Sequence, residues 1–251
     1  MPENTFITLF VAFIGAAMTA AGILKRGRGE ALRSVPCLPA ASLAAGARQF
    51  VTGRAQCQTT LAAPVTGKPC VFFLERTYRK ETRYTSKGGR RTHWALLGSR
   101  ASGAFFVRDR EGGCAVVLPH AGSAALCKPE EQESGGVFSD LCEDGATRRS
   151  EQIINEDETV TVLGAPQPLE DFMNYLAAHS ALEVPPYFLA DLKKRQADGV
   201  ATPCFFGGGV EKVADQGCEA YVAGIESSGE LLMQLGGGIA LLGILLYILG
   251  K

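Results

Sequence analysis

Two long apolar stretches lie near the two ends of the chain. Residues 5–24 hold no charged side chain, and residues 231–250 hold Gln234 as their only strongly polar one. Each stretch has about the twenty residues that a helix needs to cross the hydrocarbon core of a bilayer. A cleaved signal peptide is the alternative for the first stretch, but its basic residues follow the apolar run instead of preceding it. The pattern therefore predicts two transmembrane helices.

Small residues in the first stretch would let a second helix approach closely. Ala16 with Ala20, and Ala17 with Ala21, have the small-xxx-small spacing found between packed membrane helices. The spacing permits a close contact on that side of the helix. It is also common by chance in an alanine-rich helix, so it indicates no particular partner.

Between the two stretches, apolar residues come in short runs bounded by turn residues. The most apolar run begins at Cys70 and continues, as a strand that becomes solvated, to about residue 85. Similar runs predict strands at residues 49–58, 92–97, 104–108, 114–118, 151–154 and 159–163. We expect the first of these to be interrupted at Gly53. Turns at residues 86–91, 109–113 and 155–158 predict three hairpins.

Helical spacing is confined to short segments. Residues 40–47 and 188–196 are candidate helices, and Leu169 and Phe172 begin a third, with acidic residues in its first turn. Residues 204–206 form a last short apolar run, which predicts a strand before a glycine-rich turn.

These elements predict a mainly β fold, a small antiparallel barrel or sandwich, with flanking helices and two transmembrane helices. The expected organisation is a transmembrane helix at 5–24, a β domain at 35–166, a helical or irregular extension at 167–230 and a transmembrane helix at 231–250.

The turn at residues 64–70 reads Pro-Val-Thr-Gly-Lys-Pro-Cys and leads into an aromatic strand. Together with later blocks in the same order, it resembles the GIDE domain, also called the BAM ("beside a membrane") domain, over residues 35–166. The later blocks are residues 94–97, 105–109, 112–119, 149–154 and 160–164. Eukaryotic members are membrane-anchored mitochondrial ubiquitin ligases whose activity lies in a C-terminal RING domain. The resemblance therefore implies a β-rich module beside a membrane, with ubiquitin transfer as an alternative.

The cysteine and histidine pattern does not favour a RING. A RING closes two tetrahedral zinc sites with close pairs of ligands, whereas the eight cysteines include no Cys-x-x-Cys pair and the three histidines are isolated. The chain also ends at Lys251, so we expect no RING after the second apolar stretch. We expect free, packed thiols, no metal and no cofactor.

Nucleophilic catalysis is the other enzymatic alternative, as an unrecognised hydrolase that uses Cys70 or His93. A nucleophile needs a base beside it in space, and nothing in the spacing of these residues fixes one. We therefore expect Cys70 to pack in the core, and we assign no catalytic residue.

Charge is segregated along the chain although the formal net charge is only −1. Residues 76–110 carry ten basic side chains against two acidic ones, and residues 130–158 carry ten acidic side chains against two basic ones. The two segments either neutralise each other in part, or the basic one lies on anionic lipid, or it binds nucleic acid with interleaved aromatic residues. We disfavour the last, because both ends of the domain are expected at a membrane.

One basic surface is the candidate site for lipid headgroups or a partner. We expect it on two neighbouring strands and their turn. Its residues are Arg76, Arg79, Lys80, Arg83, Lys87, Arg90 and Arg91.

Basic residues after the first apolar stretch, such as Lys25, Arg26 and Arg28, place the domain in the cytoplasm by the positive-inside rule. The family resemblance implies the opposite side. We expect a two-span integral membrane protein that serves as an interaction module at the bilayer surface. Its partners would be the bilayer, anionic headgroups and an unidentified protein, with oligomers allowed and no nucleic acid.

Overall fold

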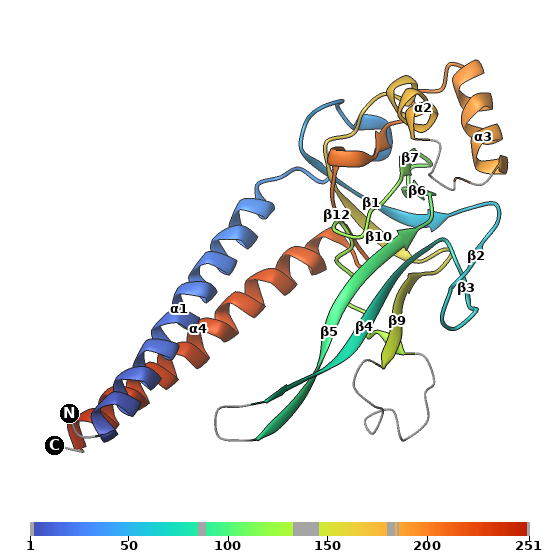
Figure 1. Ribbon diagram of the computed structural model, residues 1–251. Coiled ribbons are helices and arrows are strands. Elements are labelled where there is room, and N and C mark those ends of the chain that lie inside the picture. The colour runs from blue at the N-terminus through green and yellow to red at the C-terminus, as the bar shows by residue number, and fades with distance from the viewer. Residues whose placement is uncertain (1–2, 85–88, 133–145, 180–183, 185, 250–251) are drawn as a thin grey trace. The chain divides into compact units, whose positions relative to one another are not determined.

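The chain divides into two compact units in the computed structural model (Figure 1). One unit joins Met1–Pro36 to Cys218–Lys251, and the other is Cys37–Gly217. The structure describes all residues except 1–2, 85–88, 133–145, 180–183, 185 and 250–251.

The first unit consists of two antiparallel helices, α1 (Glu3–Arg33) and α4 (Cys218–Leu249). Both are long and apolar enough to cross a bilayer, which confirms the prediction of two such helices. Each helix also extends beyond its apolar stretch. The first continues through the basic residues after Leu24, and the second begins at Cys218 instead of Leu231.

The two helices pack along a seam of glycines that recur every seven residues. The seam glycines are Gly15, Gly22 and Gly29 in α1, and Gly229, Gly236 and Gly243 in α4. A methyl group added to Gly15 would lie 2.3 Å from the Ala240 nitrogen, and one added to Gly236 would lie 2.6 Å from the Thr19 nitrogen. Seven residues are close to two helical turns, so each set of glycines stays on one side of its helix. The two backbones therefore approach directly.

The alanines that suggested a contact side lie elsewhere. Ala16, Ala17, Ala20 and Ala21 are exposed, so the small-xxx-small spacing does not mark the interface. Beyond the apolar stretches the helices are joined by charge, since the Arg33 guanidinium lies 2.5 Å from a Glu226 carboxylate oxygen.

In the second unit, a six-stranded sheet has the order β11-β7-β6-β1-β10-β12. These strands are β1 (Gln49–Gln56), β6 (Phe105–Arg108), β7 (Cys114–Val117), β10 (Thr159–Gly164), β11 (Cys204–Phe205) and β12 (Val210–Ala214). The predicted β6–β7 hairpin is confirmed. The predicted interruption at Gly53 is wrong, because β1 runs through it. A side chain at Gly53 would lie 2.3 Å from the Arg108 carbonyl oxygen, so the glycine permits a close strand contact.

A four-stranded sheet has the order β5-β4-β9-β8, and a small pair of strands precedes it. The strands are β4 (Phe72–Tyr84), β5 (Arg90–Ser102), β8 (Glu131–Gln132) and β9 (Thr147–Ile154), with β2 (Leu61–Ala62) paired to β3 (Pro69–Cys70). The β4–β5 hairpin is confirmed and is longer than predicted. Cys70 ends β3, so it does not begin the long strand.

The hairpin predicted across residues 155–158 is wrong. β9 pairs with β4 and β8, whereas β10 pairs with β1 and β12, so the two strands belong to different sheets. The chain changes sheet through Asp157, which has a positive φ of 58°.

Two helices, α2 (Leu169–Ala178) and α3 (Pro186–Ala197), complete the unit with the short 3-10 helices η1 (Ala40–Ser42) and η3 (Gly207–Gly209). The predicted helix at residues 40–47 is thus reduced to one short turn. The core is contiguous across both sheets and these helices and includes Phe72, Phe172 and Phe205, each with no exposed surface.

The fold class is confirmed only in its coarse form. The chain is 40% helix and 32% strand, with the two long apolar helices at its ends. The described strands form open sheets and no closed barrel. Because β11 and β12 belong to the six-stranded sheet, the β-rich unit continues to Gly217 and does not stop at residue 166.

Candidate functional site

The β4–β5 hairpin carries the basic residues that the sequence singled out. Its strands pair from Phe73 opposite Ser102 to Tyr84 opposite Arg90. On the other side of β4, β9 pairs only as far as Arg79. Among the described residues, the hairpin beyond that point is a ribbon of two strands, which Figure 1 shows extending past the end of β9.

Two arginines of this ribbon lie directly opposite each other. Arg83 of β4 pairs in register with Arg91 of β5, and both side chains are exposed, as is that of Arg79. None of the three forms an ion pair with an acidic residue in the part of the chain that the structure describes. Like charges at directly opposite positions destabilise a pair of strands, so this arrangement favours binding of an anion.

The acidic residue of the ribbon, Glu81, faces a histidine. Its carboxylate oxygen Oε2 lies 3.6 Å from Nε2 of His93, the residue opposite it in β5. The ribbon thus keeps an excess of positive charge near Arg79, Arg83 and Arg91.

Other predicted members of the basic surface are placed differently. Arg76 forms an ion pair with Glu130 and donates a hydrogen bond of 2.9 Å to Gln152. Lys80 is only 7% exposed. Lys87 lies outside the described residues, and Arg90 is placed as a backbone position of β5. The exposed surface is therefore narrower than the seven predicted residues.

The Arg76 contact belongs to a set of hydrogen bonds around one carboxylate. Burial by itself would raise the pKa of Glu130. The Ser150 hydroxyl, the Arg76 guanidinium and the Tyr78 hydroxyl together hold that pKa below its ordinary value. Glu130 is therefore a charged partner for Arg76 at neutral pH.

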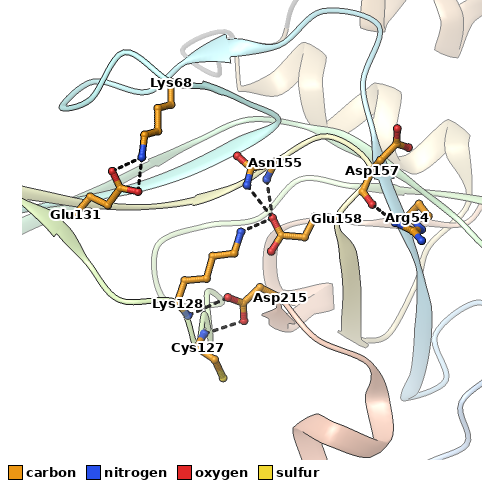
Figure 2. A network of polar contacts seen from close by, with 9 residues as sticks. All are labelled: Arg54, Lys68, Cys127, Lys128, Glu131, Asn155, Asp157, Glu158 and Asp215. Carbon is orange, nitrogen blue, oxygen red and sulfur yellow. Dashed lines mark hydrogen bonds and ion pairs between the residues drawn. The ribbon is translucent and has the colours of Figure 1, made fainter.

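Two lysines outside the basic segment, Lys68 and Lys128, pair with carboxylates of the acidic segment. Figure 2 shows Lys68 on Glu131, with Nζ 2.6 Å from Oε2, and Lys128 on Glu158, with Nζ 2.5 Å from Oε2. In the same view, the Asp215 carboxylate accepts hydrogen bonds of 2.7 and 3.0 Å from the backbone nitrogens of Cys127 and Lys128. These contacts engage both ends of the acidic segment, so lysines outside the basic segment neutralise part of its charge.

The turn that carries the family resemblance is held by a buried carboxylate. Glu151 of β9 is 1% exposed and accepts hydrogen bonds of 2.8 and 3.1 Å from the backbone nitrogens of Val65 and Thr66. Beside it, Glu75 lies 2.5 Å from Nε of Arg149. The geometry of this turn is therefore fixed by contacts inside the domain.

The structure does not bring the candidate catalytic residues together. Cys70 is fully buried, and burial, followed by the charge of Glu151, raises its pKa to about 12. His93 is exposed and lies opposite Glu81, toward the far end of β4. No group of three metal-binding side chains is found in the described ranges.

Sequence reasoning missed a stacked layer on one side of the hairpin. The Arg148 guanidinium lies 4.6 Å from the ring centre of Trp94 and 5.2 Å from that of Tyr78. Alternation along β4 and β5 is a signal that could place both rings on one side of the hairpin. It gives no sign of Arg148, because β9 reaches β4 from a distant part of the sequence.

Comparison of the chain with protein-family models, with curated proteins and with solved structures finds no match. The hairpin and its charges therefore carry the functional argument.

Proposed function

We propose that this chain is a two-span membrane protein whose β domain is an interaction module at the bilayer surface, where the β4–β5 hairpin binds anionic lipid headgroups. The observation that carries the proposal is the directly opposed pair of Arg83 and Arg91, exposed and without an acidic partner among the described residues. It occurs in a chain with two helices of membrane-spanning length.

The helical unit supports the membrane part of the proposal. Its outward surface is apolar, with Phe13 and Leu24 each 70% exposed in α1 and Leu241 62% exposed in α4. Water would disfavour such a surface, whereas lipid accepts it. Small residues at the contact and apolar ones outside are the usual arrangement of packed membrane helices.

The chemistry of the hairpin supports headgroups as the ligand. A guanidinium presents a planar set of donors that matches the oxygens of a phosphate. One phosphate between Arg83 and Arg91 would relieve their repulsion, and Arg79 would add to the attraction. Each basic residue near an anionic surface contributes about 1 kcal/mol at low salt.

Vesicle sedimentation tests the proposal. Segment Cys37–Gly217, a compact unit with its own core, should bind vesicles that contain anionic lipid and should not bind neutral ones. Replacing Arg79, Arg83 and Arg91 with Gln should abolish most of the binding. A control replaces exposed Arg110, Lys193 and Lys194 with Gln, which makes the same change of charge elsewhere. Equal losses in both variants would contradict the proposed site.

The GIDE/BAM resemblance remains a prediction, and so does the cytoplasmic side. We do not propose an enzymatic function for Cys70 and His93, since the structure holds them apart.

A further inference from the structure

The long edge strand of the four-stranded sheet contains a bulge. Gly98 lies opposite Thr77, and Leu96 lies opposite Tyr78, so Leu97 is an extra residue without its own partner on β4. A bulge re-aims the side chains around it. Here both leucines are exposed, each to 55%.

The leucines lie beside the stacked layer of Tyr78, Trp94 and Arg148. Leu96 is on the same side of the hairpin as Tyr78, which lies opposite it, and Trp94, two positions earlier on the strand. Arg148 stacks on both rings and ties β9 to them. Two exposed leucines are therefore presented on an ordered support.

The charges around the leucines indicate what covers them. β5 contains no acidic residue, and the exposed Arg91 precedes the leucines on the strand. By register Arg91 lies on the opposite side of the hairpin from Leu96, whereas Arg100, after the leucines, pairs with Glu75. Exposed apolar side chains on one side of an element, with a tryptophan beside them and basic residues on the other side, are typical of surfaces that enter the interface of an anionic bilayer. The same chain carries two helices of membrane-spanning length.

We propose that Leu96 and Leu97 insert into the boundary between headgroups and acyl chains of an anionic bilayer. The hairpin then holds the membrane by an apolar contact as well as by charge. This inference rests on the proposed function: by strand register its three arginines lie on the opposite side of the hairpin from Leu96, and from there they attract the headgroups while the apolar side inserts.

The chain supplies its own probe, since Trp94 is its only tryptophan. The full-length protein is reconstituted in bilayers that contain anionic lipid, with or without bromine on the acyl chains. Insertion predicts a blue-shifted Trp94 emission and a loss of fluorescence with brominated lipid. The loss should be larger when the bromines are close to the headgroups than when they are near the chain ends.

Variants separate insertion from mere closeness to the bilayer. The double variant Leu96→Ser and Leu97→Ser should lose the bromine quenching in the full-length protein, and segment Cys37–Gly217 with the same changes should keep its salt-sensitive binding to anionic vesicles. A control variant, Val200→Ser, removes another exposed apolar side chain and should quench as the wild type does. The thermal unfolding temperature of each variant checks that its fold is retained.

Each other result has a definite meaning. Anionic binding without any bromine quenching, or quenching that persists in the double variant, overturns the insertion and leaves the proposed function standing. Leucine-dependent quenching that is equal in neutral and anionic bilayers supports insertion and overturns the proposed role of charge. Emission that changes with the protein-to-lipid ratio but not with bromination shows that a second copy covers the leucines, which overturns the inference.

Discussion

The glycine seam between α1 and α4 makes a sharp prediction, because two neighbouring glycines of α4 differ in their surroundings. A methyl group at Gly236 would lie 2.6 Å from the Thr19 nitrogen and 2.7 Å from the Gly15 carbonyl oxygen. A methyl group at Gly237 would meet nothing within 4 Å. The same substitution to alanine is therefore an overpacking at one site and a neutral change at the next.

The loss of stability expected for Gly236→Ala follows from these distances. Ordinary contacts of a Cβ begin at about 3.4 Å, so Gly236→Ala requires the helices to separate locally by nearly 1 Å. Overpacking of this kind costs about 1–3 kcal/mol. Gly237→Ala should change the stability of the pair by less than about 0.5 kcal/mol, as surface substitutions usually do.

Energy transfer provides the assay. The helices are antiparallel, so fluorophores at the amino and carboxyl ends of the full chain report whether they are paired. Titration with a denaturing detergent should separate the Gly236→Ala helices at a lower concentration than the wild type, while Gly237→Ala follows the wild type. Equal midpoints for the two variants would refute the glycine seam.

Three further predictions concern the β domain. Cys70→Ala should lower the free energy of unfolding by about 1–2 kcal/mol through lost packing. The pKa of the folded Cys70 thiol is raised from 9.0 to about 12, so above pH 9 the unfolded thiol ionises first, and in urea unfolding the wild type should lose up to about 1.4 kcal/mol of stability per pH unit more than the variant. Stability curves that stay parallel with pH would contradict a buried thiol. Glu151→Gln should lower the free energy of unfolding of the domain by about 2–3 kcal/mol, since the amide cannot accept all the hydrogen bonds of the carboxylate. The control Glu156→Gln, at an exposed position, should have little effect on the same denaturation curve, and similar losses of stability for both variants would show that the turn does not depend on Glu151. A membrane-impermeant maleimide should reach exposed Cys37 and Cys127 only after the cell membrane is opened, because the positive-inside rule predicts a cytoplasmic domain. Labelling of intact cells would contradict this predicted orientation.

The local sequence pattern was sufficient to predict the hairpins, whose two strands are neighbours in the chain. The β4–β5 hairpin followed from a glycine turn between two alternating runs, and β6–β7 from a similar turn. The strands around Asn155 and Asp157 have a turn of the same appearance, but they pair with strands from distant parts of the chain. A turn shows that the chain reverses and does not show which strands then pair.

The helix contact and the ion pairs likewise depend on which distant parts of the chain meet. Glycines at every seventh residue were visible in both apolar stretches, and this period, rather than the alanine spacing, marks the contact side. The ion pair of Arg76 with Glu130 joins residues that are 54 positions apart, so no local pattern could remove Arg76 from the exposed surface. The bulge at Leu97 likewise depends on how β5 meets β4.

The central claim is that Arg79, Arg83 and Arg91 hold the domain to anionic headgroups. The most direct test is the dissociation constant of segment Cys37–Gly217 for anionic vesicles, compared with that of the variant in which the three arginines are Gln. Three charges at about 1 kcal/mol each predict roughly a 100-fold weaker binding of the variant at low salt. The difference should shrink toward physiological salt, where the Debye length is about 8 Å. Equal dissociation constants for the two proteins at low salt would contradict the account.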